Sequence, residues 1–168
     1  LNYLMATQED DGNWSQNMWL EGEPFWKGIQ MDQVALPIIL VHTACQNKFL
    51  DTERRNRYWP IVKKAISYLL KNGPSTPQDR WEEESGYTPF TLSAEIAALL
   101  AGADLAEENN EKEIALLCRE TADFWNENIE RWTYVTDTET SREVGVDGYY
   151  MRINPYDLPA NKVKNHYR

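Results

Sequence analysis

The chain has 168 residues, of which 42 % are hydrophobic, and this is enough for one domain with a sizeable core. Its formal net charge of −10 repels phosphate backbones, so nucleic acid is not an expected partner. The longest apolar run extends only from about Val34 to Val41, whereas a membrane span needs about 20 apolar residues, so no membrane partner is expected either.

The chain opens with a segment that resembles the last turns of a helix, stopped at Gly12. A loop rich in Trp and Gly follows over residues 13–29 and shows no periodicity. Apolar residues at helical spacing then predict helices over residues 32–46, 58–72, 90–108 and 111–131. Pro60 suits the first turn of the second of these helices. Beyond Trp132, β-branched and aromatic residues around turn formers predict a small β-hairpin, and strands are expected nowhere else.

The two cysteines, Cys45 and Cys118, lie far apart and neither belongs to a Cys-x-x-Cys pair. A zinc site is therefore unsupported, and no metal is expected. Both cysteines fall on apolar helical stripes, which favours buried free thiols over a disulfide.

Aromatic residues are unusually frequent, with seven tryptophans and nine tyrosines. Several tryptophans lie in loops among Asp, Asn, Gln and Glu, where core packing explains them less well than it explains a Trp on a helical stripe. Sugar rings present flat C–H faces that stack on aromatic side chains, while their hydroxyls bond to polar neighbours. The composition of these loops is therefore typical of a carbohydrate site.

A charged run precedes the helix expected over residues 90–108, and it consists of Asp79, Arg80, Trp81, Glu82, Glu83 and Glu84. It can be a solvated acidic turn, because carboxylates are favoured near a helix N-terminus. It can also be catalytic, since a bulky Trp81 among charges can keep one carboxylic acid protonated while a neighbour ionises.

Glycoside hydrolysis requires such an acid and a second carboxylate, which in inverting enzymes lies about 6.5–9.5 Å away. Glu82 and Glu83 are consecutive and point to opposite sides of an extended segment, so they do not form that pair. Glu82 and Glu84 could share a face, but a base that activates water normally lies across the sugar, so the second carboxylate is expected from another loop.

The stretch TPQDRWEEESGYTPFTLSAEIAALL resembles the catalytic-acid segment of glycoside hydrolase family 15, the glucoamylases and glucodextranases. NMWLEGEPFWKGIQMDQVALPI is similar to the family's earlier Trp-containing substrate loop. ETADFWNENIERWTYV and VDGYYMRINP resemble the helix and segment that come next in bacterial-type members. The resemblance covers almost the entire chain in the family's order, and it implies an all-α chain that is part of an (α/α)6 toroid.

Carried over residue by residue, the resemblance places the general acid on Glu82. It implies substrate contacts for Glu83, a supporting role for Asp79, and substrate-lining positions for Arg80 and Trp81. Trp26 then resembles the aromatic wall beside the scissile bond, followed at matching spacing by Gln30 and Asp32. The residues alone leave other interpretations open: Trp26 as core, Asp32 as a helix N-cap, and Gln30 as a partner of a backbone group.

Two sequence features of the family have no match in this chain. Nothing here matches its upstream Arg-Asp pair, which grips the terminal sugar, and the chain ends before the position of its general base. We therefore expect residues 1–168 to be a partial catalytic domain, truncated at both ends and inactive in isolation. Helix faces that lack neighbours would then favour self-association.

The resemblance implies an inverting, exo-acting α-glucosidase that releases glucose from the non-reducing ends of α-glucans or oligosaccharides, with no metal or organic cofactor. A related trehalase or glucodextranase is the nearest alternative. A second alternative is a non-catalytic (α/α) toroid that serves as a glucan-binding or regulatory scaffold. The intact Trp81-Glu82-Glu83 run argues against this alternative. A helical interaction module with Trp loops as its interface is a third.

Overall fold

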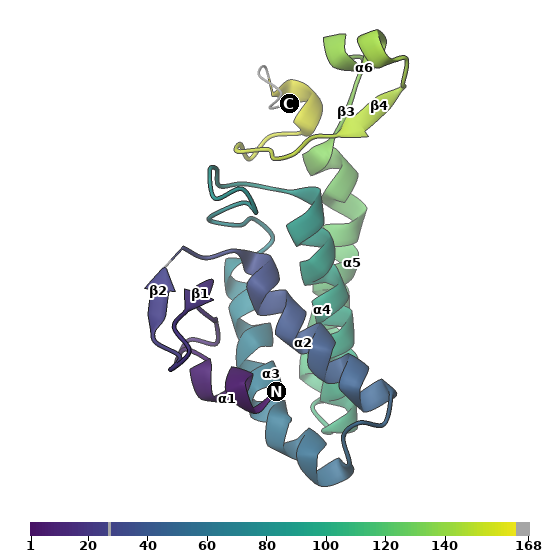
Figure 1. Cartoon of the computed structure of the whole chain (residues 1–168). Coiled ribbons are helices and arrows are strands. Elements are labelled where there is room, and N and C mark those ends of the chain that lie inside the picture. The colour runs from purple at the N-terminus through teal and green to yellow at the C-terminus, as the bar shows by residue number, and fades with distance from the viewer. Residues whose placement is uncertain (27, 164–168) are drawn as a thin grey trace.

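The computed structural model describes residues 1–26 and 28–163. Within them, four long helices form the body of the molecule: α2 (Met31–Gln46), α3 (Thr52–Asn72), α4 (Pro89–Glu108) and α5 (Lys112–Thr133) (Figure 1). The shorter elements are α1 (Asn2–Thr7), β1 (Asn17–Met18), β2 (Pro24–Trp26), β3 (Tyr134–Thr136), α6 (Glu139–Val144), β4 (Gly148–Tyr150) and the 3-10 helix η1 (Ala160–Lys162).

Helix α4 is the centre of the packing, since it contacts α2, α3 and α5. Leu92 and Leu99 on this helix are completely buried, and Gly102 lets α3 approach because a Cβ there would lie 2.7 Å from Ile66 Cδ1. By length and composition α4 is apolar enough to cross a membrane. The expectation from the sequence, which took Val34 to Val41 as the longest apolar run, did not identify this helix as apolar enough to do so. Its position among three helices accounts for that apolar character.

Three of the expected helices are confirmed to within two residues at each end, as α2, α4 and α5. The expected start of α3 at residue 58 is wrong, because the helix begins at Thr52. Asp51 caps it by accepting the backbone N–H of Arg54 at 2.9 Å. Pro60 therefore lies inside the helix and removes one backbone donor there. The opening helix ends at Thr7, earlier than the expected Gly12.

The expectation that strands occur only after Trp132 is also wrong, because β1 and β2 form an antiparallel hairpin within residues 17–26. Its turn is closed by the Trp19 N–H, which donates to the Glu23 carbonyl at 2.9 Å. The rings of Trp19 and Phe25 meet edge-on with centroids 5.1 Å apart. Strands of two and three residues are too short to show alternation, so the sequence carried no periodic signal for them.

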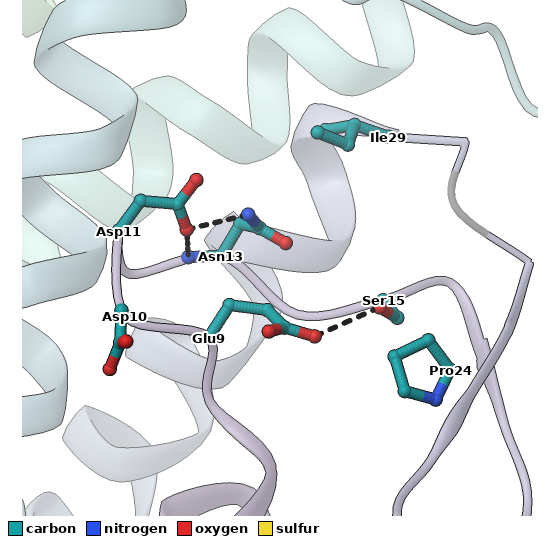
Figure 2. A pocket seen from close by; sticks show the side chains of 7 residues that line it. All are labelled: Glu9, Asp10, Asp11, Asn13, Ser15, Pro24 and Ile29. Carbon is teal, nitrogen blue, oxygen red and sulfur yellow. Dashed lines mark hydrogen bonds between the residues drawn. The ribbon is translucent and has the colours of Figure 1, made fainter.

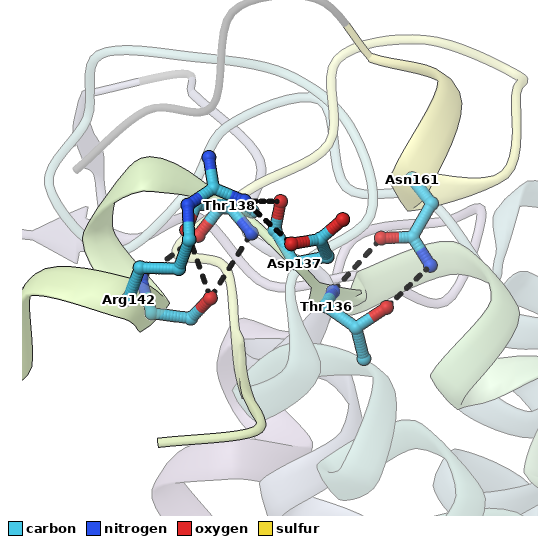
Figure 3. Close-up of polar contacts among 6 residues, drawn as sticks. Thr136, Asp137, Thr138, Arg142 and Asn161 are labelled. Atoms are coloured by element: carbon cyan, nitrogen blue, oxygen red, sulfur yellow. Dashed lines mark hydrogen bonds and ion pairs between the residues drawn. The ribbon is translucent and has the colours of Figure 1, made fainter. Parts of the chain in front are cut away.

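The hairpin expected after the last long helix is confirmed as β3 and β4, which pair antiparallel from Tyr134↔Tyr150 to Thr136↔Gly148. The short helix α6 lies between the two strands, and a reciprocal capping box of Thr138 and Ser141 begins it. Figure 3 shows Arg142 bound to Asp137 and the Thr136 N–H donating to Asn161 at 2.8 Å. The first contact ties α6 to the end of β3, and the second joins the hairpin to η1.

Cys45 and Cys118 lie in the core that the four helices share, as their apolar stripes predicted. Both thiols are free. Burial raises the pKa of Cys118 to about 11, so this thiol stays protonated at neutral pH.

Candidate active site

The loop that joins α3 to α4, residues 73–88, is here called the acid loop, and a buried carboxylate organises it. Asp79 is only 2 % exposed. One of its oxygens accepts the backbone N–H of Glu83 at 3.0 Å and that of Glu84 at 3.4 Å. The Glu82 N–H closes a turn on the Asp79 carbonyl at 2.9 Å, and Glu82 adopts a left-handed φ of 63°. The loop therefore folds around Asp79 and leaves Glu82 on its outer side.

The start of α2 holds one side of the acid loop. Gln30 donates to the Asp79 carbonyl at 3.1 Å, and the Met31 N–H donates to the Thr76 hydroxyl, also at 3.1 Å. Gln30 thus bonds a backbone group of the loop. Asp32 is buried and accepts from the Thr91 hydroxyl at 3.3 Å, and the N-cap of α2 is Gln30, so Asp32 is not a cap.

The segment after β4 holds the other side. Tyr87 and Asn154 exchange backbone hydrogen bonds of 2.9 and 2.8 Å. Gly86 precedes this bridge with a φ of 146°, and a Cβ there would collide with the Asn154 carbonyl. The acid loop is therefore fixed between two segments that are distant in sequence.

A cleft of about 490 Å³ opens beside the acid loop, and its lining consists of Gly28, Ile29, Pro77, Gln78, Glu82, Glu83, Glu84 and Ser85. Trp26 stands at its edge, with its indole N–H directed at the Gln78 side-chain oxygen at 3.4 Å. The Gln78 amide nitrogen in turn donates to the Glu82 carbonyl at 3.3 Å. The Trp- and Gly-rich segment that ends in β2, here called the Trp loop, and the acid loop thus meet at one end of the helices, as expected (Figure 1). Trp26 is 45 % exposed, so the interpretation of this residue as core is wrong.

Arg80 and Trp81 lie beside the cleft, outside the set of residues that line it. The Arg80 guanidinium stacks 4.2 Å from the centre of the Phe90 ring, a cation–π contact at the start of α4. Trp81 is 65 % exposed. In this structure the cleft wall is therefore formed by Glu82, Glu83 and the Trp26 edge, with Asp79 beneath.

Residues 8–165 match the family model of glycosyl hydrolases family 15. The chain belongs to this family. It is 40 % identical over 153 residues to a glucoamylase of Clostridium sp. (strain G0005), an alignment that covers 91 % of this chain and 20 % of that protein. It is 29 % identical to an uncharacterized glycosyl hydrolase of Methanocaldococcus jannaschii, over 92 % of this chain and 24 % of the relative.

Among solved structures, a bacterial glucoamylase complexed with acarbose superposes with a TM-score of 0.79 and 36 % identity. That match covers 94 % of this chain and 22 % of the other. The chain thus spans about a fifth to a quarter of the length of these relatives. The expected fold is confirmed: the chain is all-α with a C-terminal β-hairpin and corresponds to part of the glucoamylase (α/α)6 toroid.

Two residues at the family 15 cleft were not anticipated from the sequence. Arg152, after β4, donates to Glu83 at 2.5 Å and lies 3.7 Å from the Asp79 carboxylate. The hydrogen bond to Glu83 raises the pKa of Arg152, which remains a cation beneath the cleft. Gln16, just before β1, donates through Nε2 to the carboxylate of Glu82. Both contacts join residues more than 60 positions apart, and no local pattern indicates such pairs.

A second pocket of about 450 Å³ lies against the segment that leads into β1 and shares Ile29 with the cleft. Figure 2 shows that two of its three carboxylates bond within their own loop: Asp11 accepts from the backbone and side chain of Asn13, and Glu9 accepts from Ser15 at 3.2 Å. Among the described residues, no group of three His, Cys, Asp or Glu side chains is placed to hold a metal ion. The pocket's bonds fix the segment that carries Gln16.

Proposed function

We propose that this chain carries the general acid of an inverting, exo-acting α-glucosidase of the glucoamylase type. The observation that supports this most is the position of Glu82, which lines an open cleft on a turn fixed by Asp79, with the Trp26 edge reached through Gln78. The substrate class is an α-glucan or oligosaccharide, in keeping with the acarbose bound to the solved relative.

In the proposed reaction, Glu82 gives its proton to the glycosidic oxygen as the bond from that oxygen to the anomeric carbon breaks. Water adds to the anomeric carbon from the opposite face and loses a proton to a second carboxylate, so the configuration inverts. That base has to lie about 6.5–9.5 Å from Glu82, across the sugar. We assign it to a part of the enzyme outside these residues. The reaction requires no metal and no organic cofactor.

The remaining residues are assigned to substrate binding. Glu83, held by Arg152, presents a fixed carboxylate to sugar hydroxyls, and Trp26 offers its half-exposed ring for stacking. Asp79 stabilises the turn that carries Glu82, since its buried carboxylate accepts the backbone N–H of Glu83. Arg80 and Trp81, beside the cleft, are assigned to the adjoining wall that the rest of the enzyme would complete.

The test is Glu82→Gln in the complete enzyme that contains this chain, since Gln keeps the shape of Glu but has no acidic proton. Turnover of maltose, measured as glucose release, is expected to fall by about 10²–10⁴ or more, while acarbose binding stays within a few-fold. Glu84→Gln is the matched comparison, because Glu84 lines the same cleft. If Glu84→Gln abolished turnover and Glu82→Gln did not, the acid would be Glu84. If the unaltered enzyme bound glucan without hydrolysing it, the chain would belong to a non-catalytic toroid.

A further inference from the structure

Gln16 makes a direct side-chain contact with the carboxylate of Glu82 from a different part of the chain. Its amide Nε2 donates to Glu82 Oε1, across a sequence separation of 66 residues. Its own Oε1 is shielded from solvent, so the amide group is partly enclosed at the cleft edge. Neither the family resemblance nor the substrate loop it identifies gives this residue a role.

The backbone on both sides of Gln16 is firmly held. Before it, Trp14 is 3 % exposed, its indole N–H donates to the Leu4 carbonyl at 2.8 Å, and its own carbonyl accepts from Gln33 at 2.8 Å. After it, Asn17 begins β1 and pairs with Trp26. The short hairpin therefore positions Gln16 and Trp26 together, and it sets both relative to the acid loop.

We propose that Gln16 is a positioning residue for the general acid, selecting the oxygen of Glu82 that carries the proton. This inference rests on the proposed function. A protonated carboxyl has one O–H donor, and its other oxygen accepts. The carbonyl oxygen of a carboxyl group is a stronger acceptor than its hydroxyl oxygen, so the Gln16 N–H at Oε1 favours the form that carries the proton on Oε2. Oε2 is then the oxygen that faces the glycosidic oxygen.

The chemistry of an amide suits this task. A lysine or arginine at the same place would favour the ionised carboxylate, which cannot act as an acid. A neutral amide directs the carboxyl without adding a charge. Proton transfer depends steeply on geometry, and a misplacement of about 1 Å costs on the order of 10²-fold in rate.

The experiment compares two substrates in the complete enzyme. Maltose has a sugar leaving group that needs a proton, whereas the fluoride of α-D-glucosyl fluoride departs with little protonation. For Gln16→Ala we expect kcat on maltose to fall about 10- to 100-fold with KM within about twofold, and kcat on the fluoride to fall less than about threefold. Gln16→Glu, of equal size but without the N–H donor, is expected to show the same selective loss.

Asp10→Asn is the matched control, because Asp10 is an exposed residue on the segment that leads into β1 and lies outside the substrate loop. It is expected to leave both rates unchanged. Equal losses on the two substrates in Gln16→Ala and Gln16→Glu, or no loss on maltose, would overturn the positioning role. Glu82→Gln in the same panel separates the two claims: if it spared maltose turnover, the proposed function would fail as well, and if only Glu82→Gln lost maltose selectively, the inference about Gln16 alone would fail.

Discussion

Glu95 is a carboxylic acid in the middle of the core, and its replacement should stabilise the protein in a pH-dependent way. The residue lies on α4 with no exposed surface, and neither carboxyl oxygen has a hydrogen-bond partner among the described residues. Burial, and secondly the nearby Asp32 carboxylate, raise the pKa of Glu95 well above its ordinary 4.5. The folded protein therefore holds the Glu95 proton up to a higher pH than the unfolded chain does.

The magnitude follows from proton linkage. Because the folded state binds the extra proton, its stability is full below about pH 4.5 and declines as the pH rises toward the pKa of Glu95 in the folded state. Each pH unit between 4.5 and the pKa of Glu95 in the folded state costs about 1.4 kcal/mol of stability. Glu95→Gln cannot ionise, so the variant does not lose this stability as the pH rises. Its buried, unpaired amide lowers the free energy of unfolding by about 1 kcal/mol, which offsets part of the gain.

Urea unfolding followed by tryptophan fluorescence, between pH 5 and pH 8, measures the effect. The free energy of unfolding of Glu95→Gln minus that of the original chain should rise by about 1.4 kcal/mol for each pH unit above 4.5, until the pH reaches the pKa of Glu95 in the folded state. Glu127→Gln on α5 is the control, since Glu127 is exposed, and its difference should stay flat. A Glu95→Gln difference that does not change with pH would refute the buried, protonated state of Glu95.

Four further outcomes are expected. Glu83→Gln should raise the Kd for acarbose about tenfold and also lower kcat, because the paired carboxylate is assigned to the substrate. Arg152→Ala should lower the free energy of unfolding by about 1–3 kcal/mol, since it removes the cation nearest the buried Asp79 carboxylate, and urea titration would detect this. Cys45 and Cys118 should not react with a thiol reagent at pH 8 until urea unfolds the chain, because burial raises the pKa of both; rapid labelling of the folded chain would contradict this. The isolated 168-residue chain should be inactive on maltose and should elute as a dimer or larger in light-scattering chromatography, since α5 exposes Leu116, Leu117 and Phe124; a monodisperse monomer would count against self-association.

The long helices could be predicted because an apolar stripe over four or five turns is a strong periodic signal. The start of α3 could not, because Pro60 is a typical first-turn residue and set the expected start at residue 58, whereas the cap at Asp51 became apparent only in the structure. The helix tolerates Pro60 because tertiary packing of Ile61, Ala65 and Leu69 exceeds the loss of one hydrogen bond.

Some residues of the candidate site could be located from the sequence, and others could not. Glu82, Glu83 and Trp26 lie in compact motifs, so the resemblance could locate them, and the structure then brings their loops together through Gln78. Gln16 and Arg152 reach the acid loop from remote segments. Polar pairs of that kind have no signature in a single sequence, because each partner is by itself an ordinary surface residue.

The two-sided attachment of the acid loop has a consequence for biosynthesis. The loop bonds to Gln30 and Met31 on one side and to Asn154 on the other, and Gly86 permits the second of these contacts. A ribosome delivers the Asn154 anchor about 70 residues after the general acid, at about 5–20 residues per second. During those seconds α2, α3 and α4 can already pack, while the acid turn lacks half of its attachments. The helices can therefore pack before the acid loop is fully attached, since that attachment also requires the segment that carries Asn154.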